Sequence, residues 1–272
     1  MPTGISLHIG LNTVDPDRYE GWDGALLACE NDARDMAALA RAAGFSDSVL
    51  LTADGTVDQV TAALRQAADK LGPGDILLLT YSGHGGQVPD VTGQDDEPDA
   101  LDETLVLYDR QFLDDELYQE FRRCADGVRI IALLDCCHSG SGIELPGGGP
   151  LPATGVRLMP VPKQQQIYER DQGFFEELQR SLEKTAPPDA EAGEPAAVLI
   201  SACQDNQYAS DGPVNGAFTE ALLGVWDGGA FRGGYRAFHR AIQHRLPATQ
   251  SPNFYTTGTP AATFLSQKPF TV

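Results

Sequence analysis

Two short apolar runs constrain the fold of this chain more than any other feature. The run Asp75–Thr80 is followed by Tyr-Ser-Gly-His-Gly-Gly, and the run Val128–Leu134 is followed by Asp-Cys-Cys-His-Ser-Gly. Mainly apolar runs of this length are typical of parallel strands that are buried on both faces of a sheet. Loops at the carboxyl ends of such strands are where an open α/β sheet places its chemistry. We therefore expect His84 and Cys137 to lie together at one sheet edge, where a thiol and an imidazole can act as a pair.

The rest of the chain shows strand patterns that alternate with helical ones, which implies a mainly parallel sheet covered on both faces. The expected strands are Ile5–Leu11, Ser48–Thr52, Ile76–Tyr81, Val128–Leu134, Ala197–Ala202 and Ala262–Leu265, with a further strand-like segment at Thr104–Tyr108. The expected helices are Ala25–Ala43, Val57–Leu71, Asp114–Cys124, Ala217–Trp226 and Tyr235–Leu246. The Gly-Pro-Gly that follows Leu71 is a strong helix terminator.

Residues 146–195 differ in composition from their surroundings. Glycine and proline gather at both ends of this segment, which is typical of a flexible or extended linker, and a short helix is expected at Phe174–Lys184. Its basic residues include Arg157, Lys163, Arg170, Arg180 and Lys184. We interpret the chain as a single domain, in which the insertion joins a larger portion, residues 1–145, to a smaller one, residues 196–272. The insertion is either a segment at which the chain is cut or a tolerated surface insertion with no role in cleavage.

Charge and cysteine content exclude several classes of function. The net charge of −20 argues against nucleic acid as a partner, because phosphate binding needs clustered Lys and Arg. Acidity favours cationic substrates or metal ions, or serves solubility alone. No apolar stretch approaches the length of a membrane span, so no membrane contact is expected. The five cysteines lack Cys-x-x-Cys pairing and no signal peptide is evident, which predicts a cytoplasmic protein with free thiols.

The two motifs resemble those of metacaspases and of their bacterial relatives, the orthocaspases. The histidine lies about fifty residues upstream of the cysteine, as in caspase-type proteases. Four further segments match the family in order: Leu27–Ala33, Leu113–Leu117, Ile200–Gln207 and Gly216–Ala221. The resemblance implies the caspase–haemoglobinase fold, an α/β fold with a mainly parallel six-stranded sheet flanked by helices.

The resemblance also implies the catalytic roles. Cys137 aligns with the family nucleophile, rather than Cys136, because it directly precedes His-Ser-Gly. A cysteine attacks as the thiolate, and His84 is the expected base and acid. The backbone N–H groups of Gly85 and Cys137 are the expected oxyanion donors. Stabilisation of the oxyanion by such donors is often the largest single contribution to catalysis of acyl transfer. His138 is disfavoured as the base, since neighbours in an extended segment point apart.

The family pattern further assigns a substrate pocket to Cys29, Asp32, Ser82 and Asp135. Two carboxylates and a hydroxyl suit a guanidinium, which presents a planar fork of donors. The expected substrates are therefore proteins or peptides with Arg or Lys before the scissile bond. Two structural alternatives stand beside this interpretation. Asp32 could be a charge at a helix surface, and Asp135 could be a strand-end carboxylate that caps backbone amides.

A second candidate site is the acidic stretch between Asp90 and Glu116, in which Arg110 is the single basic residue. Dense carboxylates on loops suit Ca²⁺, which takes six to eight oxygen ligands. The resemblance implies calcium as an activator rather than a catalytic metal. Its matching positions are Asp99, Asp114, Asp115 and Glu144. A solvated acidic loop is the alternative.

We therefore expect a cysteine endopeptidase that cleaves after Arg or Lys and is activated by calcium. Self-cleavage after a basic residue of 146–195 is expected, with an upstream protease as the alternative activator. A monomer is expected, since the proline near the C-terminus blunts edge pairing. Two rival interpretations stay open: a non-catalytic, calcium-responsive scaffold or binding module, and a related peptidase directed at Asn or Asp.

Overall fold

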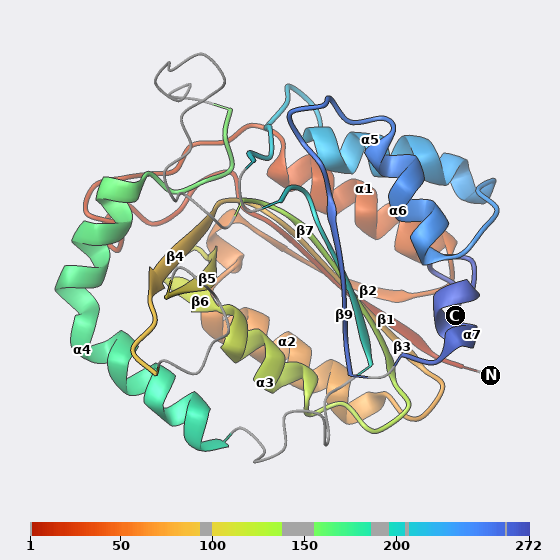
Figure 1. Ribbon diagram of the computed structural model, residues 1–272, viewed down its shortest axis with the longest axis horizontal. Helices are drawn as coiled ribbons and strands as arrows, with labels where there is room; N and C mark the ends of the chain where they lie inside the picture. Colours follow the sequence, from red (N-terminus) through yellow and green to blue (C-terminus); the bar gives the residue numbers. More distant parts are fainter. Residues whose placement is uncertain (1, 93–99, 138–154, 186–195, 205–206, 259) are drawn as a thin grey trace.

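A six-stranded sheet forms the centre of the molecule (Figure 1). The computed structural model describes residues 2–92, 100–137, 155–185, 196–204, 207–258 and 260–272. In spatial order the strands are β2 (Ser46–Leu51), β1 (Gly4–Gly10), β3 (Ile76–Ser82), β7 (Arg129–Asp135), β8 (Ala197–Ser201) and β9 (Asn253–Thr257). The first five run parallel, and β9 is antiparallel to β8. This confirms the expected α/β class and the mainly parallel sheet.

Helices cover both faces of this sheet, as Figure 1 shows. On one face lie α1 (Cys29–Ala42), α5 (Ala217–Trp226) and α6 (Tyr235–Gln243), and on the other lie α2 (Val57–Lys70) and α3 (Asp114–Phe121). Successive side chains of a strand point to opposite faces. Leu78 of β3 accordingly packs in the cluster beneath α1, α5 and α6, while Leu79 packs in the cluster beneath α2 and α3. Burial on both faces explains why the central residues of β3 and β7 are apolar.

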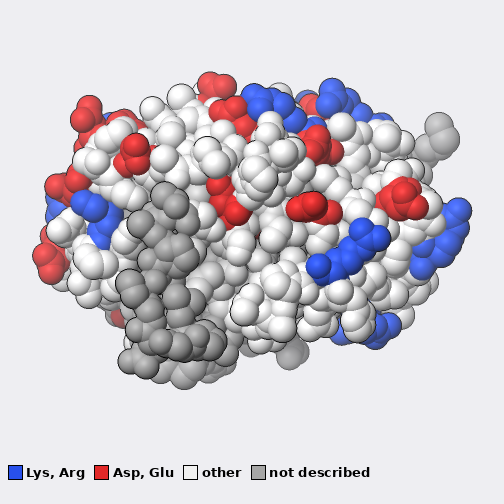
Figure 2. Space-filling view, turned by 90° about the horizontal axis from the view of Figure 1, so that it is seen from above, with Lys and Arg blue, Asp and Glu red and all other residues white. Residues whose placement is uncertain are grey.

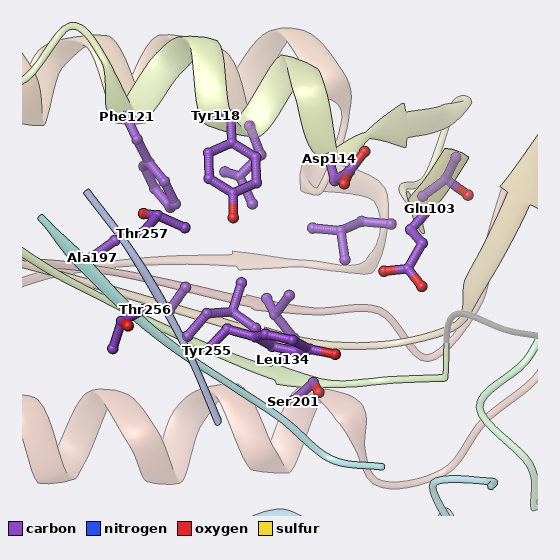
Figure 3. A pocket seen from close by; sticks show the side chains of 15 residues that line it. Glu103, Asp114, Tyr118, Phe121, Leu134, Ala197, Ser201, Tyr255, Thr256 and Thr257 are labelled. Carbon is purple, nitrogen blue, oxygen red and sulfur yellow. The ribbon is translucent and has the colours of Figure 1, made fainter. Parts of the chain in front are cut away.

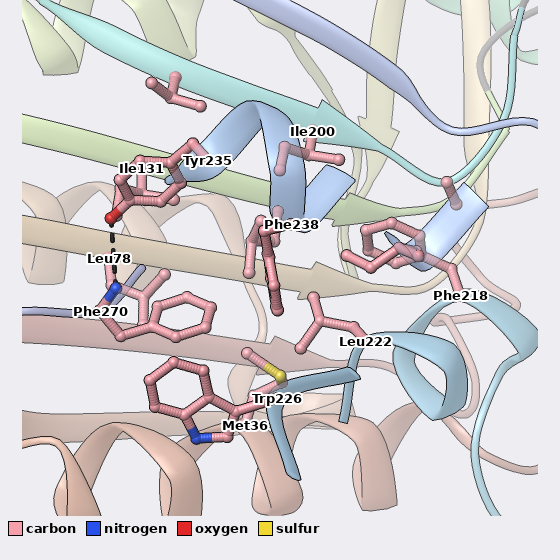
Figure 4. Close-up of a cluster of buried hydrophobic side chains, with 14 of the residues drawn as sticks. Met36, Leu78, Ile131, Ile200, Phe218, Leu222, Trp226, Tyr235, Phe238 and Phe270 are labelled. Carbon is pink, nitrogen blue, oxygen red and sulfur yellow. Dashed lines mark hydrogen bonds between the residues drawn. The ribbon is translucent and has the colours of Figure 1, made fainter. Parts of the chain in front are cut away.

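Aromatic side chains fill the core on the α5–α6 side (Figure 4). Trp226 meets Phe238 and Phe270 edge-on, with ring centroids 6.4 and 5.0 Å apart. The backbone N–H of Phe270 donates a hydrogen bond to the Tyr235 hydroxyl at 3.2 Å. These contacts tie the C-terminal segment to α6.

A small antiparallel sheet begins directly after His84. Its strands are β4 (Gly85–Pro89), β5 (Leu101–Val106) and β6 (Gln111–Leu113). The strand-like segment expected at Thr104–Tyr108 overlaps β5, whereas β4 and β6 were not expected because they are short and carry no clear alternation. Val106 donates from its backbone N–H to the carbonyl of His84 at 3.0 Å, so this sheet fixes the histidine loop.

The strand expected at Ala262–Leu265 is wrong. These residues lie in a short helix, α7 (Ala262–Ser266), whose Phe264 packs edge-on against Tyr235 at 5.4 Å. The last strand is instead β9, which pairs with β8 and is flanked by Pro252 and Gly258. Its Asn-Phe-Tyr-Thr-Thr sequence is rich in β-forming residues, a signal that the apolar Ala262–Leu265 run obscured.

The two ends of the insertion, residues 146–154 and 186–195, for which the composition predicts a flexible linker, lie outside the described residues. Residues Val161–Thr185 form one long helix, α4, which is kinked at Asp171 and includes the shorter helix expected at Phe174–Lys184. Ile167, Phe175 and Leu182 are buried and anchor this helix to the rest of the molecule. Composition at the two ends of the insertion gave no sign of these apolar anchors between them.

The described helices include none with the length and apolar character that a membrane span needs. Figure 2 shows Asp and Glu side chains interspersed with Lys and Arg over the face that it presents. On this face the acidic charge is distributed rather than gathered into one patch.

Candidate active site

The site lies where β3 and β7 end side by side. The two strands pair in parallel, with Ser82 opposite Asp135 as the last pair of the register. Each chain then turns into the loop that carries His84 or Cys137. The sheet therefore brings the two motifs together, as the strand patterns predicted.

Neighbouring groups fix the position of His84. The Tyr81 hydroxyl lies 2.7 Å from the His84 carbonyl and 2.9 Å from the Val106 carbonyl, so it pins the backbone of the loop. The Nε2–H of His84 donates to the Gly24 carbonyl at 2.9 Å, which leaves Nδ1 as the basic atom of the neutral ring. Nδ1 is buried and has no hydrogen-bond partner. Trp22 covers the imidazole, with ring centroids 4.8 Å apart.

Burial governs the protonation of this imidazole. Desolvation, with a smaller contribution from the charge of Arg157, lowers the pKa of His84 to about 4, while the hydrogen bond to the Gly24 carbonyl acts in the opposite direction. The ring is therefore neutral at pH 7 and able to accept a proton. The backbone of Leu158 also favours the protonated form, which places this residue beside the ring.

Cys137 is buried at the start of its loop. Its sulfur accepts a hydrogen bond from the Ala209 N–H and lies 3.8 Å from the Ala209 carbonyl. The sulfur is thus engaged by the Ala209 backbone, while the Nε2–H of the His84 imidazole is engaged by the Gly24 carbonyl. A thiol and an imidazole that act as a pair can lie out of hydrogen-bond reach before substrate is bound productively. The competing His138 lies outside the described residues.

The four pocket residues expected from the sequence lie together. Asp32, in the first turn of α1, accepts a hydrogen bond from the Ser82 hydroxyl at 2.7 Å. Asp135, at the end of β7, accepts from the Thr219 N–H at 3.1 Å and from its hydroxyl at 2.6 Å. Cys29 is buried beside Ser82, and burial raises its pKa to about 12, so it is a neutral thiol.

The guanidinium of Arg157 occupies the pocket. Nη2 lies 2.7 Å from Asp32 Oδ2 and 3.0 Å from Asp211 Oδ1. Nη1 lies 2.9 Å from Asp135 Oδ2 and 2.8 Å from the Ser82 hydroxyl. Arg157 has an exposed fraction of 0%, so both ends of each ion pair are shielded from water. The cavity beside Asp32, Ser82 and Asp135 has a volume of only about 10 Å³, which leaves room for at most one water molecule.

The charges in the pocket do not balance, because three carboxylates surround one guanidinium. Burial, together with the nearby charge of Asp135, raises the pKa of Asp32 to about 6 against the opposing effect of Arg157. Burial alone would lower the pKa of Arg157, but Asp135 and Asp32 keep it well above the usual range. The pocket therefore favours a cationic occupant strongly.

Three residues that line this pocket have no role predicted from the sequence. No sequence pattern indicates Asp211, because it lies in a loop after β8 and belongs to neither the histidine motif nor the cysteine motif. Gly216 and Thr219 belong to a segment that the family resemblance had matched, without a role. A side-chain Cβ at Gly216 would lie 2.5 Å from the guanidinium of Arg157. Thr219 holds Asp135, as described above, so the matched segment forms the floor of the pocket.

The backbone around Arg157 is held as firmly as its side chain. The Arg157 carbonyl accepts hydrogen bonds from the N–H groups of Gly85 and Cys137, both at 3.0 Å. The Arg157 N–H donates to the Ala209 carbonyl at 3.1 Å, and the backbone N–H of Asp211 donates to the Gly155 carbonyl at 2.8 Å. The two expected oxyanion donors thus converge on a single carbonyl oxygen.

Two of the four expected calcium ligands lie in the described part of the chain. Asp114 and Asp115 open α3, and Asp114 lies with Glu103 at one end of a cavity of about 250 Å³ between α3 and the sheet (Figure 3). Asp99 and Glu144 lie outside the described residues. Within the described ranges, no group of three or more His, Cys, Asp or Glu side chains is arranged to hold a metal ion. The oxygen donors present fit calcium in kind, but they do not complete a site.

A six-stranded, mainly parallel sheet that brings a histidine loop and a cysteine loop together defines a caspase-like protein. A profile of the caspase domain matches residues 12–263. The chain therefore belongs to the caspase domain family, as the resemblance to metacaspases predicted. Metacaspase-1 of Mycosarcoma maydis is 37% identical over 155 residues, which cover 52% of this chain and 37% of that protein. Metacaspase-1A of Aspergillus fumigatus is 38% identical over 156 residues, which cover 52% of this chain and 36% of that protein. The matched segment thus spans little more than a third of these curated relatives.

Solved structures show the same relationship. Protein GSU0716 from Geobacter sulfurreducens superposes with a TM-score of 0.88 at 46% identity, over 100% of this chain and 99% of that one. Caspase-1 from Spodoptera frugiperda superposes with a TM-score of 0.55 at 11% identity, over 95% of this chain and 88% of that one. At this low identity the second likeness concerns the fold alone, and it supports the caspase-type sheet.

Proposed function

We propose that this protein is a cysteine endopeptidase that cleaves polypeptides after Arg or Lys. The observation that carries the proposal is the buried guanidinium of Arg157 among Asp32, Asp135 and Asp211, with its carbonyl between two backbone donors. A site that binds an arginine side chain and polarises the adjoining carbonyl has the two parts that an arginine-directed peptidase needs. An aspartate in this pocket would face three like charges.

The proposed reaction follows from the arrangement of the groups. Cys137 transfers its thiol proton to Nδ1 of His84 and attacks the carbonyl carbon of the substrate arginine or lysine. The N–H groups of Gly85 and Cys137 stabilise the oxyanion that forms. His84 then protonates the leaving amine, and a water molecule hydrolyses the thioester with His84 as the base. The neutral state of His84 at pH 7 suits the first of these steps.

Calcium activation is a further part of the proposal. Carboxylates from Asp114 and Asp115 would hold the ion together with Asp99 and Glu144, and its charge would compensate the acidic loops. Self-processing within residues 146–195 is likewise proposed. The free chain is proposed to be a monomer.

The experiment that tests the proposal compares wild type with Cys137→Ala. Matched fluorogenic peptides that end in Arg, Lys or Asp are incubated with each protein, with calcium and with a chelator. We expect hydrolysis of the Arg and Lys peptides by wild type alone, and a higher rate with calcium. Calcium-independent rates would remove the calcium part of the proposal and leave the protease.

Two outcomes would contradict the core of the proposal. Equal rates for wild type and Cys137→Ala would exclude Cys137 as the nucleophile. Absence of hydrolysis by wild type, in every condition and also after Arg157 is replaced by Ala to open the pocket, would favour the non-catalytic scaffold.

A further inference from the structure

We propose that the bond between Arg157 and Leu158 is the self-cleavage site of this chain, and that each molecule cuts its own copy of the bond. Until the cut, Arg157 keeps the pocket closed to other substrates. This inference rests on the proposed peptidase function and adds to it the bond that is cut, the molecule that cuts it and the state of the uncut enzyme.

Residues 155–158 are held as an extended peptide across the site. Val156 bridges Ser210 in the antiparallel sense, and Leu158 bridges Gly85 in the parallel sense. The Met159 N–H donates to the Gly85 carbonyl at 2.9 Å. Main-chain pairing on both sides of one residue is how an extended substrate is bound by strand addition. The residue between the two bridges is Arg157.

Both the carboxylates of the pocket and the two expected oxyanion donors bind Arg157 at the same time. Its side chain pairs with three carboxylates, and its carbonyl lies between the Gly85 and Cys137 N–H groups. A structural ion pair would need only the side chain. Oxyanion donors on the carbonyl mark the bond after Arg157 as the one presented for attack.

The other described basic residues of the insertion are excluded as the cleavage site by their place in a helix. Lys163, Arg170, Arg180 and Lys184 all lie within α4. Helical backbone groups are bonded to one another, so these residues cannot lie extended in the site unless the helix unfolds. Arg170 is further tied to Glu20 and Asp171 at 2.7 and 2.6 Å.

The chemistry of the cut consumes one water molecule. The Cys137 sulfur bonds to the carbonyl carbon of Arg157, the bond to the Leu158 nitrogen breaks, and that nitrogen leaves with the proton held by His84. Water then adds to the thioester, His84 accepts its proton, and the carbon–sulfur bond breaks to give the Arg157 carboxylate and the free thiol. In the structure the sulfur is held by the Ala209 N–H, so it must turn from Ala209 before it can attack.

Burial explains why the cut is made within one molecule. Arg157, Leu158 and Met159 have exposed fractions of 0%, 6% and 0%, so a second molecule cannot reach the bond. The same burial prevents a peptide substrate from entering the pocket. Activity towards other substrates should therefore appear only after the cut, or in a variant without the Arg157 side chain.

The test measures intact masses and new N-termini after incubation with calcium and with chelator. Wild type and Arg157→Lys should yield a fragment that begins at Leu158, because a lysine retains the charge that the pocket binds. Cys137→Ala and Leu158→Pro should remain whole, the latter because proline removes the amide N–H and alters the leaving group while Arg157 stays in its pocket. Arg170→Ala is the matched control, because it removes an arginine from the insertion without touching the site, and it should be cut like wild type.

Mixing experiments test the intramolecular part. Processed wild type is added in excess to Cys137→Ala, whose bond should stay uncut. Cleavage of that bond at the wild-type rate would overturn cutting within one molecule. Arg157→Ala, which cannot close its own pocket, should hydrolyse an arginine peptide without prior processing, and more than tenfold faster than Leu158→Pro. Equal rates for these two variants would overturn the closed state.

Failure of this inference is distinguishable from failure of the proposed function. Hydrolysis of arginine peptides by wild type, with the chain intact or cut at a bond other than Arg157–Leu158, would overturn the inference and keep the peptidase. Absence of peptide hydrolysis by wild type and by Arg157→Ala would overturn the peptidase, and the inference with it.

Discussion

Arg157 is fully buried although it carries a charge, and Asp32, Asp135 and Asp211 explain how. An unpaired buried charge costs several kcal/mol, so a guanidinium persists here only because carboxylates surround it. The converse holds for the pocket, since removing the cation would leave three carboxylates facing one another. Burial and the charge of Asp135 raise the pKa of Asp32 to about 6 even with Arg157 present, so this carboxylate binds a proton more readily than usual.

Gly216 provides a prediction at this scale. Its replacement by Ala places a Cβ 2.5 Å from the Arg157 guanidinium, which must then withdraw. We expect Gly216→Ala to lower kcat/KM for arginine peptides about tenfold or more, as overpacking costs about 1–3 kcal/mol. Gly173→Ala is the control, because nothing lies within 4 Å of a Cβ there. Unchanged kinetics in Gly216→Ala would show that arginine does not bind against this glycine.

The strands differ in how well the sequence predicted them. β3 and β7 were predicted because a strand buried on both faces needs a continuous apolar run, and the same runs located His84 and Cys137. β9 and α4 were not predicted correctly, since tertiary contacts rather than local pattern define them: β9 is completed by pairing with β8, and α4 by a few widely spaced apolar anchors.

The pocket shows the same limit. Residues adjoining the strand ends or the first helix were found from motifs, as with Asp32, Ser82 and Asp135. Asp211 was not, because its loop is brought to the site only by the folding of the C-terminal portion. The occupant of the pocket could not be inferred either, since no local pattern distinguishes Arg157 from the other basic residues of the insertion.

Strand β1 provides a prediction at the scale of the element. His8 lies opposite Thr80 of β3, with Nδ1 2.8 Å from the threonine hydroxyl. Burial, with a smaller contribution from Arg41, lowers the pKa of His8 from 6.5 to about 3. The unfolded chain takes up this proton near pH 6.5, whereas the folded chain does so only near pH 3. The free energy of unfolding should therefore fall as pH is lowered through this window, by up to about 1.4 kcal/mol per pH unit.

Urea denaturation at several pH values, with His8→Asn as the comparison, checks this expectation. His84 contributes in the same direction between pH 6.5 and about 4, and Asp32 acts in the opposite direction below about pH 6. Both groups remain in the variant, so the difference between the two proteins isolates His8. The variant should lose less stability than wild type on acidification. Parallel pH profiles would contradict the prediction.

At the scale of the whole molecule, the site is shared between distant parts of the chain. The portion before residue 146 provides His84 and Cys137, while the C-terminal portion provides Ala209, Asp211 and the floor of the pocket. Parallel pairing of β7 with β8 joins the two portions in one sheet. A cut after Arg157 therefore leaves both portions held by the pairing that builds the site.

The edge of the sheet also bears on assembly. The expectation of a monomer rested on the proline-containing segment after Ala262, which forms α7 instead of an edge strand. The edge strand at the C-terminal side of the sheet is β9, whose residues are half-buried or exposed. The monomer therefore stays a prediction. Pairing of β9 between two molecules would contradict it.

The central claim is that the three carboxylates select a cationic side chain, and one ratio tests it most directly. The ratio is kcat/KM for an arginine peptide over the same peptide with citrulline, which has nearly the same shape without the charge. It is measured with processed wild type and with Asp135→Asn. We predict a ratio of about 100 or more for wild type, as expected for a buried charge pair, and a clearly smaller ratio for the variant. Equal rates on the two peptides in wild type would contradict the account.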